Sequence, residues 1–256
     1  MNFGIIIQAR TGSKRFPKKV LKNIHKNKSI LEFQILRILN CFDKKNLFIA
    51  TTNLKKDRII KKIAQKYQIR SYEGSENDVL KRYIDCAKKY KIKNIVRITS
   101  DCPLVDPQLI KKMITTFYRK KIDYLSNTLP IYNSCYPDGT DIEVFKYKSL
   151  IKVNKLAKTR PEREHVTNSF WKKKNTFKIE IIKMKVNLSK YKFSIDYQNE
   201  LNLVKKIVLK LNKKNLRGTA KEIVNIIRKD TIMNKLSQKS RKKFFKKRKD
   251  LDLDLD

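Results

Sequence analysis

The sequence has 256 residues, 40% of them hydrophobic and 34% charged, so it is long enough to bury the core of one large domain. Its formal net charge of +39 is typical of proteins that bind nucleic acid or anionic membranes, yet the lysines are spread through almost every predicted helix. No apolar run approaches the ~20 residues of a membrane-spanning helix, no N-terminal segment resembles a signal peptide, and no C-x-x-C pair indicates a zinc site. We therefore expect a cytoplasmic globular protein.

The first predicted strand, residues 3–7, ends in a strongly cationic loop. This loop has one glycine, one proline and five cations, Arg10, Lys14, Arg15, Lys18 and Lys19. Ligands of open α/β sheets bind beyond the carboxyl ends of the strands, so the loop is placed to bind an anion, with polyphosphate as the first candidate. It has neither the Walker nor the dinucleotide glycine motif, so arginine forks and lysine charges would replace a glycine cradle. The alternative is a solvated basic loop.

Strands and amphipathic helices then alternate along the first half of the chain. Ser29 and Glu32 have the spacing of a capping box, which predicts that a helix begins there. The expected elements that follow are strand 46–51, helix 57–67, strand 69–72, helix 76–90 and strand 94–99. This alternation predicts βαβ units and a parallel sheet.

The pattern changes after a helix that begins at Pro107. Strands 123–127 and 140–145 flank a loop with two prolines, which predicts antiparallel strands and part of a substrate wall. We expect helix 159–172, strands 177–183 and 192–195, and helices 199–211 and 219–229 to complete one domain, residues 1–232. Residues 233–256, with the run RKKFFKKRKD and then LDLDLD, predict a basic C-terminal tail, a frayed helix with a disordered end.

Two aspartates follow predicted strands. Asp101 comes after strand 94–99, and Asp196 comes after strand 192–195, so both are expected at the edge of the sheet that carries the cationic loop. Mg²⁺ is usually held by one or two carboxylates together with substrate phosphates. The pair predicts a magnesium site, and the alternative is that each aspartate caps a helix or a turn.

Six ordered motifs resemble the cytidylyltransferase family, and within it the SpsF-like spore coat polysaccharide biosynthesis proteins, relatives of the CMP-sialate and CMP-Kdo synthetases. They are ARTGSKRFPKK, EGSENDVLKRY, RITSDCPLVDP, YPDGTDIEVF, REHVT and SIDY, which run from residue 9 to residue 197. The resemblance implies a three-layer α/β/α sandwich, the Rossmann-like nucleotide-diphospho-sugar transferase fold, with a mixed, mostly parallel sheet. It also implies a Mg²⁺-dependent homodimer that transfers CMP from CTP to an acidic or amino sugar and releases pyrophosphate, in surface polysaccharide or glycan biosynthesis.

The resemblance also assigns roles to residues. The triphosphate side, with the catalytic groups, would comprise Arg10, Ser13, Arg15, Lys19 and Asp101. Base and ribose contacts would come from Thr51, Gly74, Ser75, Asn77 and Asp78. The loop from Tyr136 to Asp141 is the expected sugar wall, with His165 as a candidate sugar contact, and Glu143 and Arg163 are further predicted substrate-binding residues. The magnesium ligands would be Asp101 and Asp196. Phe16, Lys18 and Tyr197 depart from the family's usual leucine, glycine and threonine.

Two other functions fit the sequence. A related nucleotidyltransferase or glycosyltransferase that uses another nucleotide would keep the same sheet and aspartates. A basic nucleic-acid-binding protein would need clustered cations interleaved with aromatic residues, and only the C-terminal tail has them.

Overall fold

A seven-stranded sheet forms the centre of the computed structural model, which describes residues 2–130, 134–172 and 174–250. The strand order is β5-β4-β1-β6-β8-β7-β9. β1 pairs in parallel with both β4 and β6, whereas β8 runs antiparallel to its neighbours β6 and β7. The sheet is therefore mixed and mostly parallel, as predicted. Its strands are β1 (Phe3–Gln8), β4 (Leu47–Thr52), β5 (Arg70–Gly74), β6 (Asn94–Thr99), β7 (Tyr124–Ser126), β8 (Glu143–Lys146) and β9 (Ile179–Ile181).

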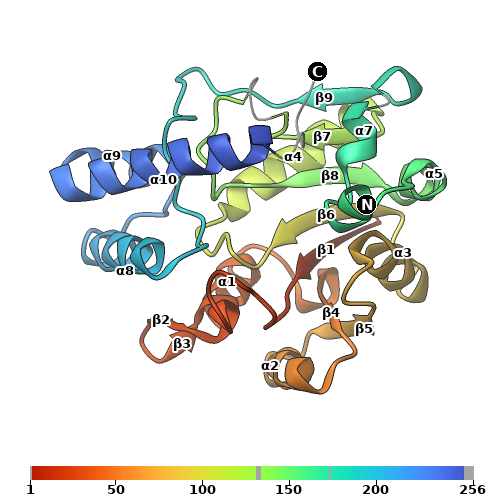
Figure 1. The fold of residues 1–256 in the computed structure, drawn as a ribbon, viewed down its shortest axis with the longest axis horizontal. Helices are drawn as coiled ribbons and strands as arrows, with labels where there is room; N and C mark the ends of the chain where they lie inside the picture. The colour runs from red at the N-terminus through yellow and green to blue at the C-terminus, as the bar shows by residue number, and fades with distance from the viewer. Residues whose placement is uncertain (1, 131–133, 173, 251–256) are drawn as a thin grey trace.

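Helices cover both faces of the sheet, which confirms the three-layer α/β/α architecture (Figure 1). Ile5 and Ile7 of β1 pack into one apolar cluster and Ile6 into the other, because successive side chains of a strand point to opposite faces. One face is covered by α1 (Ile30–Leu39), α2 (Arg58–Lys66) and α4 (Pro107–Lys120), and the other by α3 (Val79–Lys89), α5 (Tyr147–Leu156) and α7 (Asn168–Lys172). The predicted capping box of Ser29 and Glu32 is present at the start of α1.

A third apolar cluster lies at one end of the molecule, where α8, α9 and α10 gather (Figure 1). It combines a small hairpin with three C-terminal helices: β2 (Asn23–His25), β3 (Lys28–Ser29), α8 (Gln198–Lys213), α9 (Ala220–Arg228) and α10 (Thr231–Asp250). The remaining short elements are α6 (Arg160–Glu164) and the 3₁₀ turns η1 (Lys19–Leu21), η2 (Lys44–Asn46), η3 (Lys55–Asp57) and η5 (Lys174–Thr176).

The helix expected in the tail is present, since residues 233–250 belong to α10, but it packs against the domain instead of fraying away from it. Met233, Ser237 and Arg241 are at most 4% exposed and recur every four residues, so one face of α10 is buried against the protein. Two of these three side chains are polar, which is why no apolar stripe marks the helix in the sequence. Residues 251–256 of the predicted tail lie outside the described residues.

Two other expectations need correction, and one helix was missed. The predicted helix 159–172 is two short helices, α6 and α7, because the backbone of Val166 between them adopts φ 58°. The predicted strand 192–195 makes only an isolated bridge between Asp138 and Lys192. α5, which follows β8 directly, was not predicted.

The order of the strands creates a crevice beside β1. The chain runs from β1 to β4 and β5 on one side and then returns to β6 on the other side of β1. Loops that leave the carboxyl ends of strands on either side of such a reversal diverge, and ligands bind between them. Within the described part of the chain, no helix is both long and apolar enough to cross a membrane.

Candidate functional site

The cationic loop after β1 is anchored by a buried aspartate. Asp57, 0% exposed, accepts hydrogen bonds from the backbone nitrogen of Thr11 at 2.7 Å and from its Oγ1 at 2.6 Å. Its other carboxylate oxygen accepts a short hydrogen bond from Thr52 at the end of β4. The loop is therefore fastened to the neighbouring strand, and its cations start from a fixed base. Lys18, where the family commonly has glycine, adopts the left-handed conformation at φ 54°.

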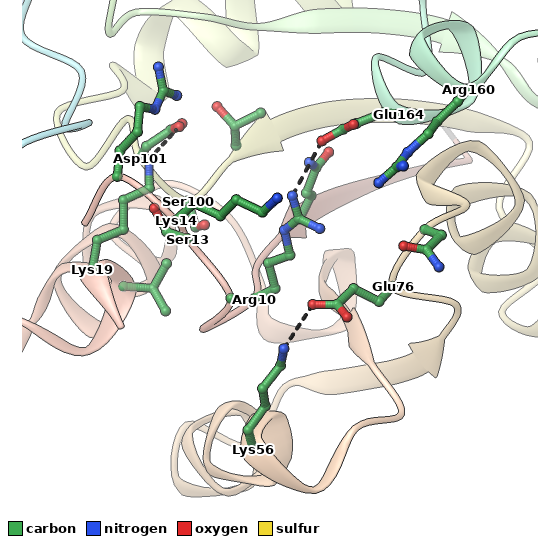
Figure 2. A pocket seen from close by; sticks show the side chains of 16 residues that line it. Arg10, Ser13, Lys14, Lys19, Lys56, Glu76, Ser100, Asp101, Arg160 and Glu164 are labelled. Atoms are coloured by element: carbon green, nitrogen blue, oxygen red, sulfur yellow. Dashed lines mark hydrogen bonds and ion pairs between the residues drawn. The ribbon is translucent and has the colours of Figure 1, made fainter. Parts of the chain in front are cut away.

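The loop forms one wall of a cavity of about 720 Å³, called the first cavity below. Six of the described side chains that line it are cations and three are carboxylates, so its charge is predominantly positive: Arg10, Lys14, Arg15, Lys19, Lys56 and Arg160 face Glu76, Asp101 and Glu164. Figure 2 shows Arg10 between Glu164 of α6 and Glu76 of the loop before α3. Arg10 lies 3.3 Å from Glu164, and Lys56 lies 3.0 Å from Glu76.

Lys19 joins the two aspartates that the sequence singled out. Its Nζ donates to Asp101 Oδ2 at 3.0 Å, to Asp196 Oδ1 at 3.3 Å and to the carbonyl of Ile195 at 2.7 Å. Arg15 adds a second cation to Asp196, at 2.8 Å. The two carboxylates therefore converge on one point that a positive charge already occupies.

The contacts between Lys19 and the aspartates shift the pKa values of Asp101 and Lys19. Burial of the Asp101 carboxyl would raise its pKa, but attraction to Lys19 and hydrogen bonds from Thr99 and Lys19 together hold the pKa well below its usual range. Burial would lower the pKa of Lys19, and the two aspartates outweigh that effect, so its pKa is raised. Both groups stay ionised around neutral pH.

Asp101 and Asp196 are positioned by different hydrogen bonds. Asp101 follows β6, and Gln34 of α1 clamps this turn by donating to the carbonyls of Thr99 at 2.9 Å and Cys102 at 2.8 Å. Asp196 follows no sheet strand; its backbone nitrogen donates to Glu200 at the start of α8 at 2.6 Å. The carbonyl of Asp101 accepts from the backbone nitrogen of Ile195 at 2.9 Å, which ties the two segments together.

A second cavity of about 230 Å³ adjoins the first, and five side chains line both: Gln8, Arg15, Thr99, Asp101 and Glu164. In contrast to the first cavity, the second has more carboxylates than cations among its described lining side chains. Six described carboxylates line it, Asp101, Asp138, Asp141, Glu143, Glu164 and Asp196, against three guanidinium groups, Arg15, Arg97 and Arg241. Asp101 and Arg15 therefore lie at the boundary between a positive and a negative cavity.

The C-terminal helix completes the second cavity. Arg241 of α10 pairs with Asp138 at 3.2 Å, and Asp138 also accepts from Ser194 Oγ at 2.5 Å. Phe244, one turn further along α10, lines the same cavity. The sequence did not indicate these contributions, because the segment has the composition of a solvated arm.

Ten of the sixteen predicted site residues line a cavity. The first cavity has Arg10, Ser13, Arg15, Lys19, Asn77 and Asp101, and the second has Asp141, Glu143, His165 and Asp196. Thr51, Gly74, Ser75, Asp78, Tyr136 and Arg163 line neither cavity.

The structure gives several of these six residues a structural role. Arg163 pairs with Asp78 at 2.6 Å and so fastens α6 to the start of α3. Tyr136 is 6% exposed and belongs to the apolar core rather than to a substrate wall. Thr51 is fully buried in β4, and its hydroxyl has no hydrogen-bond partner among the described residues.

Four charged residues of the first cavity were missed by the sequence interpretation: Lys56, Glu76, Arg160 and Glu164. Glu76 and Glu164 lie inside motifs that the sequence did mark, whereas Lys56 and Arg160 are single cations in a lysine-rich chain. Arg82, in the same motif as Glu76, is 1% exposed, and its guanidinium nitrogens have no hydrogen-bond partner among the described residues.

Known proteins share both the sequence and the fold. A family model described as cytidylyltransferase matches residues 4–240. An uncharacterized protein of Methanocaldococcus jannaschii, MJ1063, is 37% identical over 174 residues, which cover 68% of this chain and 69% of that protein. The spore coat polysaccharide biosynthesis protein SpsF of Bacillus subtilis is 29% identical over 212 residues, 80% of this chain and 85% of SpsF.

A solved structure extends the likeness to three dimensions. The structure of a cytidylyltransferase from Leptospira borgpetersenii serovar Hardjo-bovis superposes with a TM-score of 0.83 at 29% identity, over 91% of this chain and 96% of that one. The residues that the family model matches include all those that line the first cavity, and all those that line the second cavity except Arg241 and Phe244.

Proposed function

Because the chain belongs to the cytidylyltransferase family, we propose that it transfers CMP from CTP to an acidic or amino sugar and releases pyrophosphate, for surface polysaccharide or glycan biosynthesis. The observation that carries this proposal is the positive first cavity beyond β1, which meets a smaller cavity at Asp101 and Arg15. A triphosphate is the most highly charged part of either substrate, so it belongs in the positive cavity. The smaller cavity is left for the sugar.

The reaction needs a sugar hydroxyl to attack the α-phosphorus of CTP while the bond to pyrophosphate breaks. The hydroxyl loses its proton to solvent, and the departing pyrophosphate carries the negative charge of the broken bond. Arg10, Arg15 and Lys19 supply positive charge where this charge grows, and the loop fixed by Asp57 holds them in place. Catalysis here requires positioning and charge neutralisation, and no covalent nucleophile.

The ion pairs of the free site suit an exchange of partners on binding. Arg15 and Lys19 now neutralise Asp196 and Asp101, at 2.8 Å and 3.0 Å. When phosphate oxygens arrive, the same cations can pair with phosphate, and the two carboxylates are then free to take a different cation. The site therefore avoids uncompensated buried charge before and after the nucleotide binds.

Asp101 and Asp196 fit a magnesium ion. Both are oxygen donors, and both already share one ammonium group, Lys19 Nζ, so they can share a cation. Within the described residues, no group of three or more histidine, cysteine, aspartate or glutamate side chains converges as a metal site, so the remaining ligands would be phosphate oxygens and water. A bound Mg²⁺ would polarise the α-phosphate and neutralise part of the triphosphate charge.

The test uses the purified protein with Mg²⁺, each of the four nucleoside triphosphates in turn, and a panel of ulosonic and amino sugars. Pyrophosphate release is the readout. We expect release with CTP, and release with UTP or GTP but never with CTP would overturn the proposal.

A matched pair of variants tests the site itself. Asp101→Asn keeps the size of the side chain and removes its charge, and we expect it to lower turnover about 100-fold or more while the fold is retained. Asp43→Asn removes a carboxylate whose side chain is 70% exposed, far from both cavities, and should leave turnover unchanged. Full activity of Asp101→Asn with Mg²⁺ would refute the assignment of this residue.

A further inference from the structure

The two cavities differ in charge in a way that bears on the identity of the sugar. Among the described lining residues, cations outnumber carboxylates six to three in the first cavity, and carboxylates outnumber guanidinium groups six to three in the second. If the second cavity binds the sugar, a sugar carboxylate would enter the cavity that has more carboxylates than guanidinium groups. Like charges held close together in a partly buried site repel strongly.

The guanidinium groups of the second cavity are already engaged. Each one has a carboxylate partner: Arg15 with Asp196 at 2.8 Å, Arg97 with Glu143 at 2.5 Å, and Arg241 with Asp138 at 3.2 Å. Arg241 is buried with Asp138, and Arg97, whose side chain is 12% exposed, pairs with the buried Glu143, so a sugar carboxylate would have to break one of these ion pairs to reach either guanidinium group. Arg15 can change partners, but its alternative partner is the triphosphate.

One carboxylate of the second cavity, Asp141, has no cation partner among the described residues. Asp196 and Asp101 are held by Lys19 and Arg15, Glu164 by Arg10, Asp138 by Arg241 and Glu143 by Arg97. Asp141 accepts a hydrogen bond from the backbone nitrogen of Gly139 at 2.7 Å and contacts Cys102 Sγ at 3.4 Å, and it has no ion pair within the described part of the chain. This side chain is only partly buried and lines the cavity, where no described cation pairs with it.

Several buried polar atoms around the cavity lack a hydrogen-bond partner in the described part of the chain. Glu143 Oε2, Thr128 Oγ1 and Asn168 Nδ2 belong to side chains between 3% and 6% exposed, and none of these atoms has a hydrogen-bond partner among the described residues. Buried polar groups in proteins are normally hydrogen-bonded, so these atoms mark places where a ligand can donate or accept. An acceptor, Glu143 Oε2, comes from the same β8 region as the uncompensated Asp141.

We infer that the second cavity binds a sugar that carries a protonated amine and no carboxylate, with the ammonium group facing Asp141 and Glu143. This inference rests on the proposed function, since it takes the second cavity as the sugar site of a CMP transfer. An ammonium group has three donors and a positive charge, so it satisfies the free Glu143 oxygen and compensates Asp141. The ring hydroxyls pair with Thr128 and Asn168.

The test compares sugars that share one ring. The panel contains glucose, glucuronic acid, and aminodeoxyglucoses with the amine at carbon 2, 3, 4 or 6, each also in its N-acetylated form. CTP binding is first measured by calorimetry, and pyrophosphate release with CTP is then measured for each sugar. We expect at least one free amine to be used with a KM about 10- to 100-fold lower than that of its N-acetylated form, the range for losing a hydrogen bond between charged groups.

A variant assigns this preference to its residue. Asp141→Asn keeps an oxygen that can accept from Gly139, so it should melt like the wild type, and it should raise the KM for the amine about 10-fold or more without changing the affinity for CTP. Asp85→Asn, on the outer face of α3, is the matched control and should change neither quantity.

The outcomes separate the two proposals. A protein that does not bind CTP refutes the proposed function. A protein that binds CTP but prefers glucuronic acid, ignores N-acetylation, responds to no amine, or keeps its preference in Asp141→Asn overturns the inference about the amine.

Discussion

Replacing Arg241 by methionine tests whether α10 belongs to the folded domain. Arg241 and Asp138 form an ion pair in which the side chains are 4% and 7% exposed, so neither charge has water as a substitute partner. Removing one member of a buried ion pair typically costs about 3–5 kcal/mol, because the other charge is left uncompensated. Since Asp138 keeps its hydrogen bond from Ser194 and the charge of Lys192 nearby, we expect the lower end, about 3 kcal/mol.

The assay is thermal unfolding, monitored by circular dichroism. For a domain of this size, about 3 kcal/mol corresponds to a fall in Tm of roughly 6–12 °C. Lys242→Met, at the neighbouring exposed position, is the matched control and should shift Tm by no more than about 1–2 °C. The double variant Arg241→Met with Asp138→Asn should recover most of the loss, because it leaves no buried charge unpaired.

The pH dependence has a defined sign. Burial raises the pKa of Asp138, and Arg241 opposes that rise, so the variant without Arg241 has a still higher pKa at Asp138. A carboxyl whose pKa is raised in the folded state destabilises the fold at pH values above that pKa. The difference in Tm between Arg241→Met and the wild type should therefore become smaller as pH falls. An unchanged Tm for Arg241→Met, or no recovery in the double variant, would refute the view that this pair fastens α10 to the domain.

Three further predictions concern other parts of the chain. Gly139→Ala should lower stability by about 1–3 kcal/mol in denaturant unfolding, because φ is 108° and a Cβ would lie 2.7 Å from the backbone nitrogen of Ser194; an unchanged midpoint would contradict this. Glu32 has a pKa lowered to about 2, since burial is outweighed by hydrogen bonds from Lys66 and Ser29, so it stabilises the fold above its ordinary pKa of 4.5 and this contribution is lost as pH falls through 2. Glu32→Gln should therefore show a smaller loss of Tm between pH 5 and pH 2 than the wild type, and equal losses would argue against the pairing. Lys19→Met should weaken CTP binding about 10-fold or more, measured by calorimetry. It should also raise the pKa of Asp101, because Lys19 is the main counter-charge of that carboxylate. An unchanged affinity for CTP would show that Lys19 does not bind the triphosphate.

Several features of this protein are local, and the sequence alone predicted them. Short isoleucine-rich strands alternating with amphipathic helices are enough to predict the parallel core, because the two periods are properties of each segment. The capping box at Ser29 and the cationic loop after β1 are equally local, and the structure has both in the predicted places. Asp101 follows β6 directly, so the end of that strand sets its place at the cavity.

Tertiary structure decided the features that depend on distant partners. Asp196 reaches the site although residues 192–195 form no sheet strand, because an isolated bridge between Asp138 and Lys192 and a contact to Glu200 hold it there. The division into a positive and a negative cavity depends on which cation meets which carboxylate across the fold, and a uniformly lysine-rich sequence does not show this. A basic C-terminal segment has the composition of a solvated arm, and it becomes part of the second cavity because the buried Asp138 offers Arg241 a partner that a local pattern cannot reveal.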